Sequence, residues 1–371
     1  MTIATPMKNM IYPCCIRVLV VKLNLYYCSE HELHFPSSAS PENPDRIKKI
    51  YRYLVNRQES MPFLKIVDKV KPATESDLLR IHEASYLEFI KKAVERGNTF
   101  LGDSTYLSRG SIIAAEFAAG AAIAACTDVI DEKADFGYAL TRPPGHHATS
   151  DKFGGYCLFN NAAIAIAYLR EMKKARRVFI CDWDAHAGNG TMRIFYEDPD
   201  VYKFSIHRDP HDFYPHDGFL YQIGHGEGRG YTANMEMPPG SGNDEYLVVL
   251  EELVIPLIKQ YKPDLILGLN GFDAHFSEPN VGLKLTASGY RTLVEKLAKL
   301  GKLVILQEGG YNQNNPVLAN VIVNALGGKT LVVTEDFDPL SSAVTGTLKT
   351  RKVVEEKVKE LKSALKEYFN L

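Results

Sequence analysis

The sequence predicts an α/β fold in which helices cover both faces of a central, mainly parallel sheet. Short apolar runs of β type alternate along the chain with longer segments of helical pattern, which is typical of such a sheet. Asp, His and Tyr residues directly follow several of these apolar runs. Because ligands bind beyond the carboxyl ends of the strands in an open parallel sheet, we expect these polar residues to meet in one crevice.

The predicted strands and helices follow one another along the whole chain. The run Ile16–Val21 is predicted as the first strand, since it is too short and too charged for a membrane span or a secretory signal. Further strands are predicted at 136–140, 178–181, 201–204, 265–269 and 303–306, and helices at 111–130, 160–169, 246–261 and 288–300. A C-terminal helix over 351–369 is predicted from apolar residues spaced by four and three, which are Val354, Val358, Leu361, Leu365 and Tyr368. We expect it to pack on the domain, with a subunit contact as the alternative.

The composition is that of an ordinary soluble globular protein. The chain has 371 residues, of which 45% are hydrophobic and 24% are charged. No linker-like stretch separates the polar motifs between 142 and 311, so we expect a single domain over 1–371 with a core at 16–330. The formal net charge of −2 gives no electrostatic reason to expect nucleic acid or an anionic membrane as a partner. The composition leaves homo-oligomer formation open.

The cysteines bear on the cellular compartment. Six cysteines occur, and none forms a CxxC pair. Cys126, Cys157 and Cys181 lie in apolar runs, where a free cysteine behaves as a small hydrophobic residue. We therefore expect reduced thiols and a cytoplasmic protein.

Two predicted strand ends carry residues that can bind a metal ion. Asp184 and His186 stand two positions apart, so alternation along an extended chain points both side chains to the same side. Asp273, at the end of another strand, is the expected third ligand. Two carboxylates and one imidazole suit Zn²⁺ with further positions open to water and substrate, and Fe²⁺ is a competitor. Taken singly, each aspartate would more often cap a helix than bind a metal, but together with His186 they favour a metal site.

The other strand ends supply groups for proton transfer. His146 and His147 form a tandem pair, and neutral imidazole is the usual general base near pH 7. We expect one ring to face the reacting water and the other the leaving group, with Asp182 and Asn189 as candidates to hold them. Tyr311 follows two glycines, and its phenol could donate a hydrogen bond to a developing oxyanion. Most tyrosines are packing residues, and only its position distinguishes this one.

Five ordered motifs together resemble the histone deacetylase superfamily, which includes the acetylpolyamine amidohydrolases. They are Arg142–Ala148, Phe153–Asn161, Asp182–Thr191, Gly271–Asp273 and Glu308–Tyr311, and Pro41–Arg46 extends the likeness toward the N-terminus. The resemblance implies zinc-dependent hydrolysis of an N-acetyl amide on an arginase/deacetylase-like three-layer fold.

The resemblance also implies a role for each matching residue. The metal ligands would be Asp184, His186 and Asp273, and the catalytic residues His146, His147, Asp182, Asn189 and Tyr311. The substrate would contact Gly155, Tyr156, Tyr214 and Asn280, with the two tyrosines as aromatic walls of a tunnel. A structural potassium ion would lie near Asp182, Asp184 and Ser205.

The departures from the family concern the substrate more than the chemistry. Ala187 stands where a second histidine is usual, but that residue is not a ligand. Asn280 stands where relatives have leucine or a glutamate that favours cationic polyamines. The segments His207–Pro215 and Thr232–Asn234 look closer to the acetylpolyamine amidohydrolases. We therefore expect either a small acetylated amine or acetyl-lysine as substrate.

Two other functions stay open at this point. A non-catalytic acyl-ligand-binding or regulatory protein could use the same fold, although the complete set of ligands, histidines and Tyr311 argues against it. An arginase-like amidino-hydrolase would need further carboxylates for a second metal ion, and Asn189 and His275 stand at those positions. A single metal ion is therefore favoured.

Overall fold

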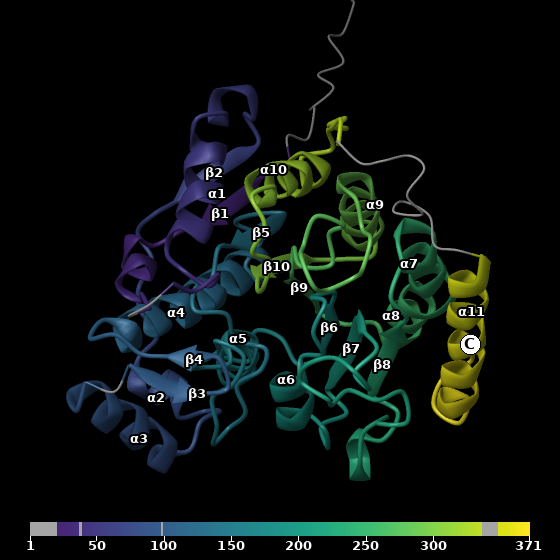
Figure 1. Ribbon diagram of the computed structural model, residues 1–371, viewed down its shortest axis with the longest axis horizontal. Helices are drawn as coiled ribbons and strands as arrows, with labels where there is room; N and C mark the ends of the chain where they lie inside the picture. The colour runs from purple at the N-terminus through teal and green to yellow at the C-terminus, as the bar shows by residue number, and fades with distance from the viewer. Residues whose placement is uncertain (1–20, 37–38, 98, 336–347) are drawn as a thin grey trace, which may run out of the picture.

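A parallel β-sheet forms the centre of the molecule. The computed structural model describes residues 21–36, 39–97, 99–335 and 348–371. Its 8-stranded sheet has the order β2-β1-β5-β10-β9-β6-β7-β8, and all neighbouring strands are parallel (Figure 1). The strands are β1 (Leu23–Tyr26), β2 (Leu64–Val67), β5 (Phe136–Ala139), β6 (Val178–Asp182), β7 (Val201–Arg208), β8 (Thr232–Met237), β9 (Leu265–Asn270) and β10 (Leu303–Gln307). A separate antiparallel hairpin consists of β3 (Phe100–Gly102) and β4 (Thr105–Tyr106).

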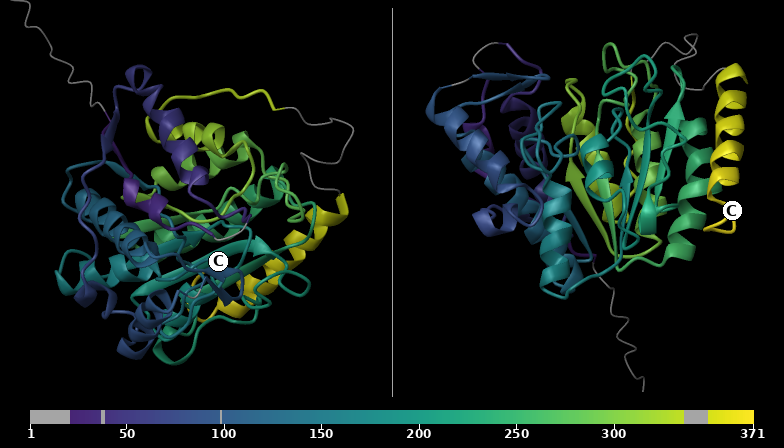
Figure 2. Two further views of the ribbon diagram at one scale, coloured as in Figure 1. Left: turned by 60° about the vertical axis from the view of Figure 1, so that its left-hand side comes forward. Right: turned by 90° about the horizontal axis from the view of Figure 1, so that it is seen from below.

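Helices cover both faces of the sheet (Figure 2). One face packs against α1 (Asp45–Val55), α7 (Asn243–Val249), α8 (Ile255–Tyr261), α9 (Ala287–Ala298), α10 (Asn315–Leu326) and α11 (Leu348–Leu365). The other face packs against α4 (Ser111–Ile130) and α5 (Asn161–Glu171), with α3 (Ala84–Glu95) outside them. The short helices are α2 (Glu75–Leu78), α6 (Asn189–Ile194), η1 (Ser29–Leu33), η2 (Gln58–Ser60) and η3 (Gly226–Gly228). This arrangement is the three-layer α/β fold that the sequence predicts.

The continuous apolar runs of the strands follow from this double coverage. In β6, Val178 and Ile180 lie in the core shared with α4 and α5, whereas Phe179 and Cys181 lie in the core of the opposite face. All four side chains are buried. Successive strand residues point to opposite faces, so a strand covered on both sides needs apolar residues at every position.

Most predicted strands are confirmed, with three differences. The strand predicted at Ile16–Val21 lies almost entirely outside the described residues, and β1 begins at Leu23. The strand predicted at 201–204 continues to Arg208, so Ser205 lies inside β7 and not after it. The two edge strands β2 and β8 were not predicted, because polar residues such as Lys65 and Glu236 interrupt their apolar pattern.

The predicted helices are confirmed with small shifts of their ends. The stretch predicted at 246–261 contains one turn of π-helix, Leu250–Val254, between α7 and α8. The C-terminal helix α11 ends at Leu365, and four of its five stripe residues are buried against the domain. α11 packs on α7 and β8, as the packing interpretation expects.

The apolar helix α4 is a core element. By length and composition it could cross a membrane, but 56% of its most apolar window is buried inside the protein. It packs against the sheet beside α5, with α3 on its outer side. This packing accounts for its apolar composition.

Candidate metal centre and active site

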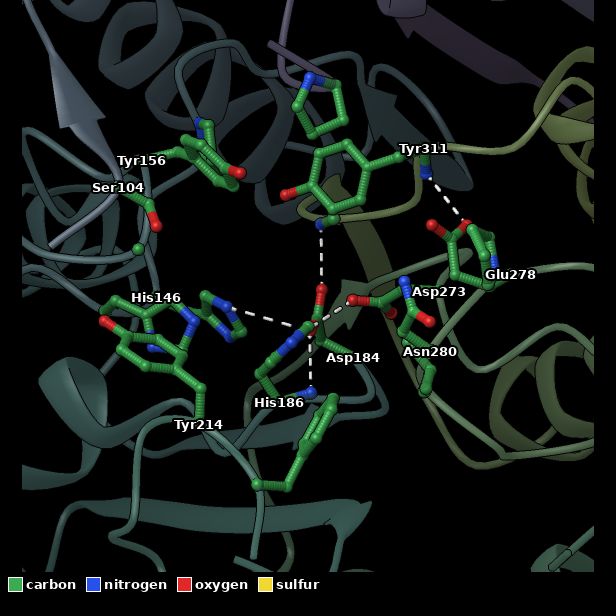
Figure 3. A pocket seen from close by; sticks show the side chains of 18 residues that line it. Ser104, His146, Tyr156, Asp184, His186, Tyr214, Asp273, Glu278, Asn280 and Tyr311 are labelled. Carbon is green, nitrogen blue, oxygen red and sulfur yellow. Dashed lines mark hydrogen bonds and ion pairs between the residues drawn. The ribbon is translucent and has the colours of Figure 1, made fainter. Parts of the chain in front are cut away.

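The five motif strands are neighbours in the sheet, in the order β5-β10-β9-β6-β7. Asp184 and His186 follow β6, and Asp273 follows the adjacent strand β9. The ligand atoms of these three residues all lie within 4.8 Å of one another (Figure 3). His186 Nδ1 is 2.9 Å from Asp273 Oδ2 and 3.2 Å from Asp184 Oδ1. The parallel arrangement therefore brings together the three predicted ligands.

Backbone amides hold the two carboxylates in place. Asp184 Oδ2 accepts a hydrogen bond from Gly309 N at 2.8 Å, and Asp184 Oδ1 accepts one from His186 N at 2.9 Å. Asp273 Oδ1 accepts a hydrogen bond from Ala185 N at 2.9 Å. Each carboxylate thus has a fixed orientation, which a preformed metal site requires.

The electrostatics of this trio fit a divalent cation. Both carboxylates are completely buried. Burial, followed by the neighbouring charge of Asp184, raises the pKa of Asp273 to about 7. Burial lowers the pKa of His186, but hydrogen bonds to Asp184 and Asp273 outweigh it and raise that pKa to about 10. Two buried carboxylates side by side need a positive charge between them, and an O, O, N donor set suits Zn²⁺ or Fe²⁺.

The tandem histidines lie beside the trio and have different partners. Their ring centroids are 4.0 Å apart. His147 Nδ1 is 2.8 Å from Asn189 Oδ1, and because an amide oxygen only accepts, Nδ1 carries the proton and Nε2 keeps its lone pair. His146 Nδ1 is 3.3 Å from Asp182 Oδ2, and its Nε2 is 3.9 Å from Asp184 Oδ1. The structure therefore pairs the histidines with Asp182 and Asn189 as predicted.

The different partners of the two rings also shift their pKa values in opposite directions. Burial, with the neighbouring rings of His146 and His186, holds the pKa of His147 well below its usual range. Burial also lowers the pKa of His146, but the charges of Asp184 and Asp182 outweigh it and raise that pKa to about 9. With no ion beside Asp184, these shifts favour a neutral His147 and a protonated His146.

Tyr311 follows β10 and points its hydroxyl into the same space (Figure 3). Its backbone N–H donates to Glu278 Oε2 at 3.0 Å. The buried guanidinium of Arg46 lies 5.2 Å from the centroid of the Tyr311 ring. Arg46 Nη1 also donates to the carbonyl oxygens of Glu308 at 2.7 Å and Gly309 at 3.3 Å. The turn that carries Tyr311 is therefore held from two sides.

A cavity of about 430 Å³ opens above these groups. Its lining includes the three predicted metal ligands, the histidine pair, Tyr311 and all four predicted substrate residues. Gly155 has a φ of 48°, and a β-carbon there would lie 2.3 Å from His147 Cδ2. Only glycine lets this backbone approach the ring so closely.

Aromatic rings form the walls of the cavity. The ring of Tyr156 is 5.7 Å from that of Tyr311, and the ring of Tyr214 is 5.1 Å from that of His147. Phe213, which the sequence did not single out, stacks on His186 at 4.7 Å. Asn280 lines the cavity on the side of the loop that carries Glu278 (Figure 3). The walls suit an aliphatic chain with a polar group at its far end.

The residues expected around a potassium ion have other partners. Asp182 Oδ2 lies 2.8 Å from Lys203 Nζ, and the hydroxyl of Ser205 lies 2.9 Å from His207 Nδ1. The ammonium group of Lys203 already gives Asp182 a counter-charge, so a monovalent cation beside this carboxylate would compete with it. The potassium site near Asp182, Asp184 and Ser205 is therefore not supported by this arrangement.

The residues at the positions of a second metal ion are also engaged elsewhere. Asn189 Oδ1 is bound by His147. The ring of His275 lies 2.7 Å from Ser277 Oγ and 2.7 Å from Glu335 Oε1. The arrangement favours one metal ion over the pair of an arginase-like site.

Among the described residues, one further group could hold a metal by proximity alone. It consists of Asp209, His211 and Glu236. Lys357 from α11 contacts both Asp209 and Glu236, so the two carboxylates already have a cation. This group joins α11 to the sheet.

Several residues that support the site were not predicted from the sequence. Arg46 lies in the Pro41–Arg46 motif and Glu278 lies two residues before Asn280, but nothing in their sequence pattern indicates that they support Tyr311. Glu308 Oε2 accepts from Gly145 N at 2.7 Å and His146 N at 3.2 Å, which fixes the histidine turn. A charged residue within an apolar strand is the one signal that could have revealed Lys203.

The comparisons with known proteins identify the family. The model of the histone deacetylase domain matches residues 40–326. The chain is 36% identical to the histone deacetylase-like amidohydrolase of Pseudomonas aeruginosa over 264 residues, which are 69% of each protein. It is 34% identical over 292 residues to a probable deacetylase of Archaeoglobus fulgidus, covering 76% of this chain and 80% of that one.

A solved structure agrees with these matches. The crystal structure of the HDA15 HD domain superposes with a TM-score of 0.84 at 27% identity, over 94% of this chain and 96% of that one. The fold is thus of the arginase/deacetylase type. The chain belongs to the histone deacetylase family. It is, more narrowly, a deacetylase-type hydrolase of acetylated substrates.

Proposed function

We propose that this protein is a zinc-dependent deacetylase that hydrolyses N-acetylated amines. The observation that carries the proposal is the convergence of an Asp–His–Asp ligand set, a histidine pair and a tyrosine hydroxyl in one cavity. Asp184, His186 and Asp273 would hold the ion. Zinc suits this donor set, and ferrous iron is the alternative, since metal supply decides as much as affinity.

The protein groups divide the proton transfers between them. A divalent ion held by the trio would supply Lewis acidity. His147 Nε2 is the acceptor for a proton from the attacking water, because Nδ1 donates to Asn189. As the water oxygen adds to the acetyl carbon, the hydroxyl of Tyr311 donates a hydrogen bond to the developing oxyanion. His146 then donates a proton to the amine nitrogen as the C–N bond breaks, which releases acetate and the free amine.

The cavity supports a small acetylated amine as substrate, with acetyl-lysine as the alternative. Tyr156, Tyr214 and Phe213 can enclose an aliphatic chain beside the acetyl group. Asn280 can accept a hydrogen bond from an ammonium group further along the substrate, but it provides no Coulomb attraction. The near-neutral net charge of −2 offers no broad attraction for a strongly basic histone tail.

Four cysteines of the described chain, Cys28, Cys126, Cys157 and Cys181, are free and buried. Thiols persist in a reducing environment. We therefore also propose a cytoplasmic location. Fractionation of the native host, with the protein followed by antibody, would test it, and recovery from an extracellular or periplasmic fraction would contradict it.

A substrate panel tests the proposed activity. Zinc-loaded protein is incubated with acetylputrescine, acetylspermidine and an acetyl-lysine peptide, and acetate and free amine are both measured. We expect equal amounts of the two products, with the polyamines cleaved faster than the peptide. Tight binding without product release would indicate an acyl-ligand-binding protein. Urea release from arginine by protein with two bound metal ions would indicate an arginase-like enzyme.

A further inference from the structure

A lysine is buried beneath the histidine pair. Lys203 lies in the middle of β7, and its side chain is 1% exposed. Its Nζ is 2.8 Å from Oδ2 of Asp182, which is completely buried. In the sheet register Lys203 pairs with Ile180, and Ser205 pairs with Asp182. The lysine is therefore the diagonal cross-strand neighbour of the aspartate, and both side chains lie on the same face of the sheet.

A buried ion pair of this kind gives the fold little net stability. Moving two charges out of water costs more hydration free energy than their mutual attraction returns, unless the geometry is favourable. Apolar residues can therefore often replace a buried ion pair without loss of stability. On the same face of β7 the neighbour of Lys203 is Val201, which is apolar and buried. A lysine on this buried face suggests that the ammonium acts on its partner Asp182.

Asp182 is the residue that connects Lys203 to the catalytic groups. Its Oδ2 is shared by Lys203 Nζ at 2.8 Å and His146 Nδ1 at 3.3 Å. Its Oδ1 accepts from the backbone N–H of Asp184 at 3.2 Å. One carboxylate thus positions a catalytic ring and the backbone of a metal ligand, while the ammonium supplies its counter-charge.

The space around this contact is filled. A β-carbon on Gly188 would lie 2.2 Å from Asp182 Oδ2, 3.1 Å from Lys203 Nζ and 3.2 Å from His146 Nδ1. The hydroxyl of Ser205, the other side chain expected at a monovalent cation, is bound to His207. The groups that would coordinate a potassium ion by their side chains are thus committed to protein partners.

We propose that Lys203 is a positioning residue whose ammonium group replaces a bound monovalent cation as the counter-charge of Asp182. The inference rests on the proposed function for the role of His146, but the cation replacement itself does not depend on activity. Two consequences follow. The protein needs no potassium for stability or catalysis, and removal of the ammonium creates a site that a small cation can fill.

The first experiment uses the unmodified, zinc-loaded protein. Its melting temperature and kcat are measured in sodium, potassium, ammonium and tetramethylammonium chloride at equal ionic strength. Both quantities should be the same in all four salts. A rise in melting temperature or kcat that is specific to potassium would overturn the proposal.

The second experiment removes the ammonium. Lys203→Ala should lower kcat by about tenfold or more while KM changes little, because Lys203 does not line the substrate cavity. Potassium, ammonium or methylammonium should raise the melting temperature of this variant and restore part of its kcat, whereas bulky tetramethylammonium should not. An unchanged kcat, or a loss that no small cation reverses, would overturn the proposal.

Two further variants separate this effect from ordinary destabilisation. Lys357 also pairs with two carboxylates, Asp209 and Glu236, outside the cavity. Lys357→Ala should lower the melting temperature but leave kcat unchanged and show no rescue by small cations; rescue equal to that of Lys203→Ala would overturn the proposal. If Lys203→Ala does not fold, Lys203→Met keeps most of the apolar stem and lacks the terminal ammonium group, so the same cation-specific gain in melting temperature is expected.

The two proposals can fail separately. If the unmodified protein hydrolyses no acetyl amide, the proposed function is wrong. The melting temperatures of the unmodified protein and of the Lys203 variants in the four salts still decide the cation replacement.

Discussion

The floor and the rim of the cavity are built in different ways. The floor residues Asp184, His186 and Asp273 follow buried strands directly, and hydrogen bonds fix each carboxylate. The rim comes from loops, in which Ser104 and Asn280 have φ angles of 57° and 68°. Such left-handed backbone is costly for residues other than glycine and is retained chiefly at functional sites. The difference indicates that the sheet fixes the chemistry, whereas the loops set the choice of substrate.

The largest effect should come from the floor. Asp184→Ala or His186→Ala should abolish metal retention and reduce kcat/KM by about a thousandfold or more, because the ion supplies several kcal/mol of stabilisation to the transition state. Metal content per chain and kcat/KM are measured together. Asp209→Ala, in the acidic group beside α11, is the control. This variant should keep the metal content and the kcat/KM of the unmodified protein. A variant at Asp184 that retains a full complement of metal would remove that residue from the ligand set.

A smaller but still large effect is expected at Tyr311. Tyr311→Phe should fold normally, keep its metal and lose about 10²–10³ in kcat, because one donor to the oxyanion disappears. Tyr156→Phe is the matched control, since Tyr156 lines the same cavity beside Tyr311. It should change KM more than kcat. Equal losses of kcat in the two variants would show that the hydroxyl of Tyr311 has no special role.

The rim should change selectivity and leave the chemistry intact. Asn280→Glu should raise kcat/KM for acetylated polyamines by about ten- to a hundredfold, which corresponds to about 1.5–3 kcal/mol for a charged hydrogen bond. Asn280→Leu should lower it, and neither variant should alter the metal content. The ratio of kcat/KM for acetylspermidine and an acetyl-lysine peptide is the quantity to measure. An unchanged ratio in both variants would separate Asn280 from substrate choice.

The smallest effect concerns the stability of the fold at His82, which contacts the start of α5. Burial lowers the pKa of His82 to about 4, and its Nε2 accepts a hydrogen bond from Asn160 N at 3.0 Å. The unfolded chain binds a proton at His82 below its ordinary pKa of about 6.5, and the folded chain does so only near 4. The stability is therefore full above pH 6.5 and falls with acidification, by about 2 kcal/mol at pH 5 from this residue.

His82→Gln keeps a hydrogen-bond acceptor but has no titrating proton. Its free energy of unfolding in urea, measured at pH 7.5 and pH 5, should fall by less than that of the unmodified protein. Other groups titrate equally in both proteins and cancel in the comparison. If both proteins lose the same stability, His82 does not contribute to the acid sensitivity.

The same contrast explains how much the sequence could predict. The strands of the floor are buried throughout and carry no polar side chain before their last residue, so their ends and the residues that follow them could be recognised. The edge strand β8 has polar residues and was missed. Phe213 and Lys203 could not be assigned, because their roles depend on side chains that approach from other segments, His186 and Asp182 respectively. Local pattern identifies a strand end, but it does not show which distant side chain fills the space above or beneath it.

Titration of the metal-free protein with Zn²⁺ tests the central claim most directly. The ion is removed by chelation, zinc is added stepwise, and bound metal and deacetylase activity are followed in the same samples. The account predicts that both rise together and reach a plateau at one ion per chain, and that the Asp184→Ala protein shows neither rise. A plateau at two ions, or full activity in protein shown to be free of metal, would contradict it.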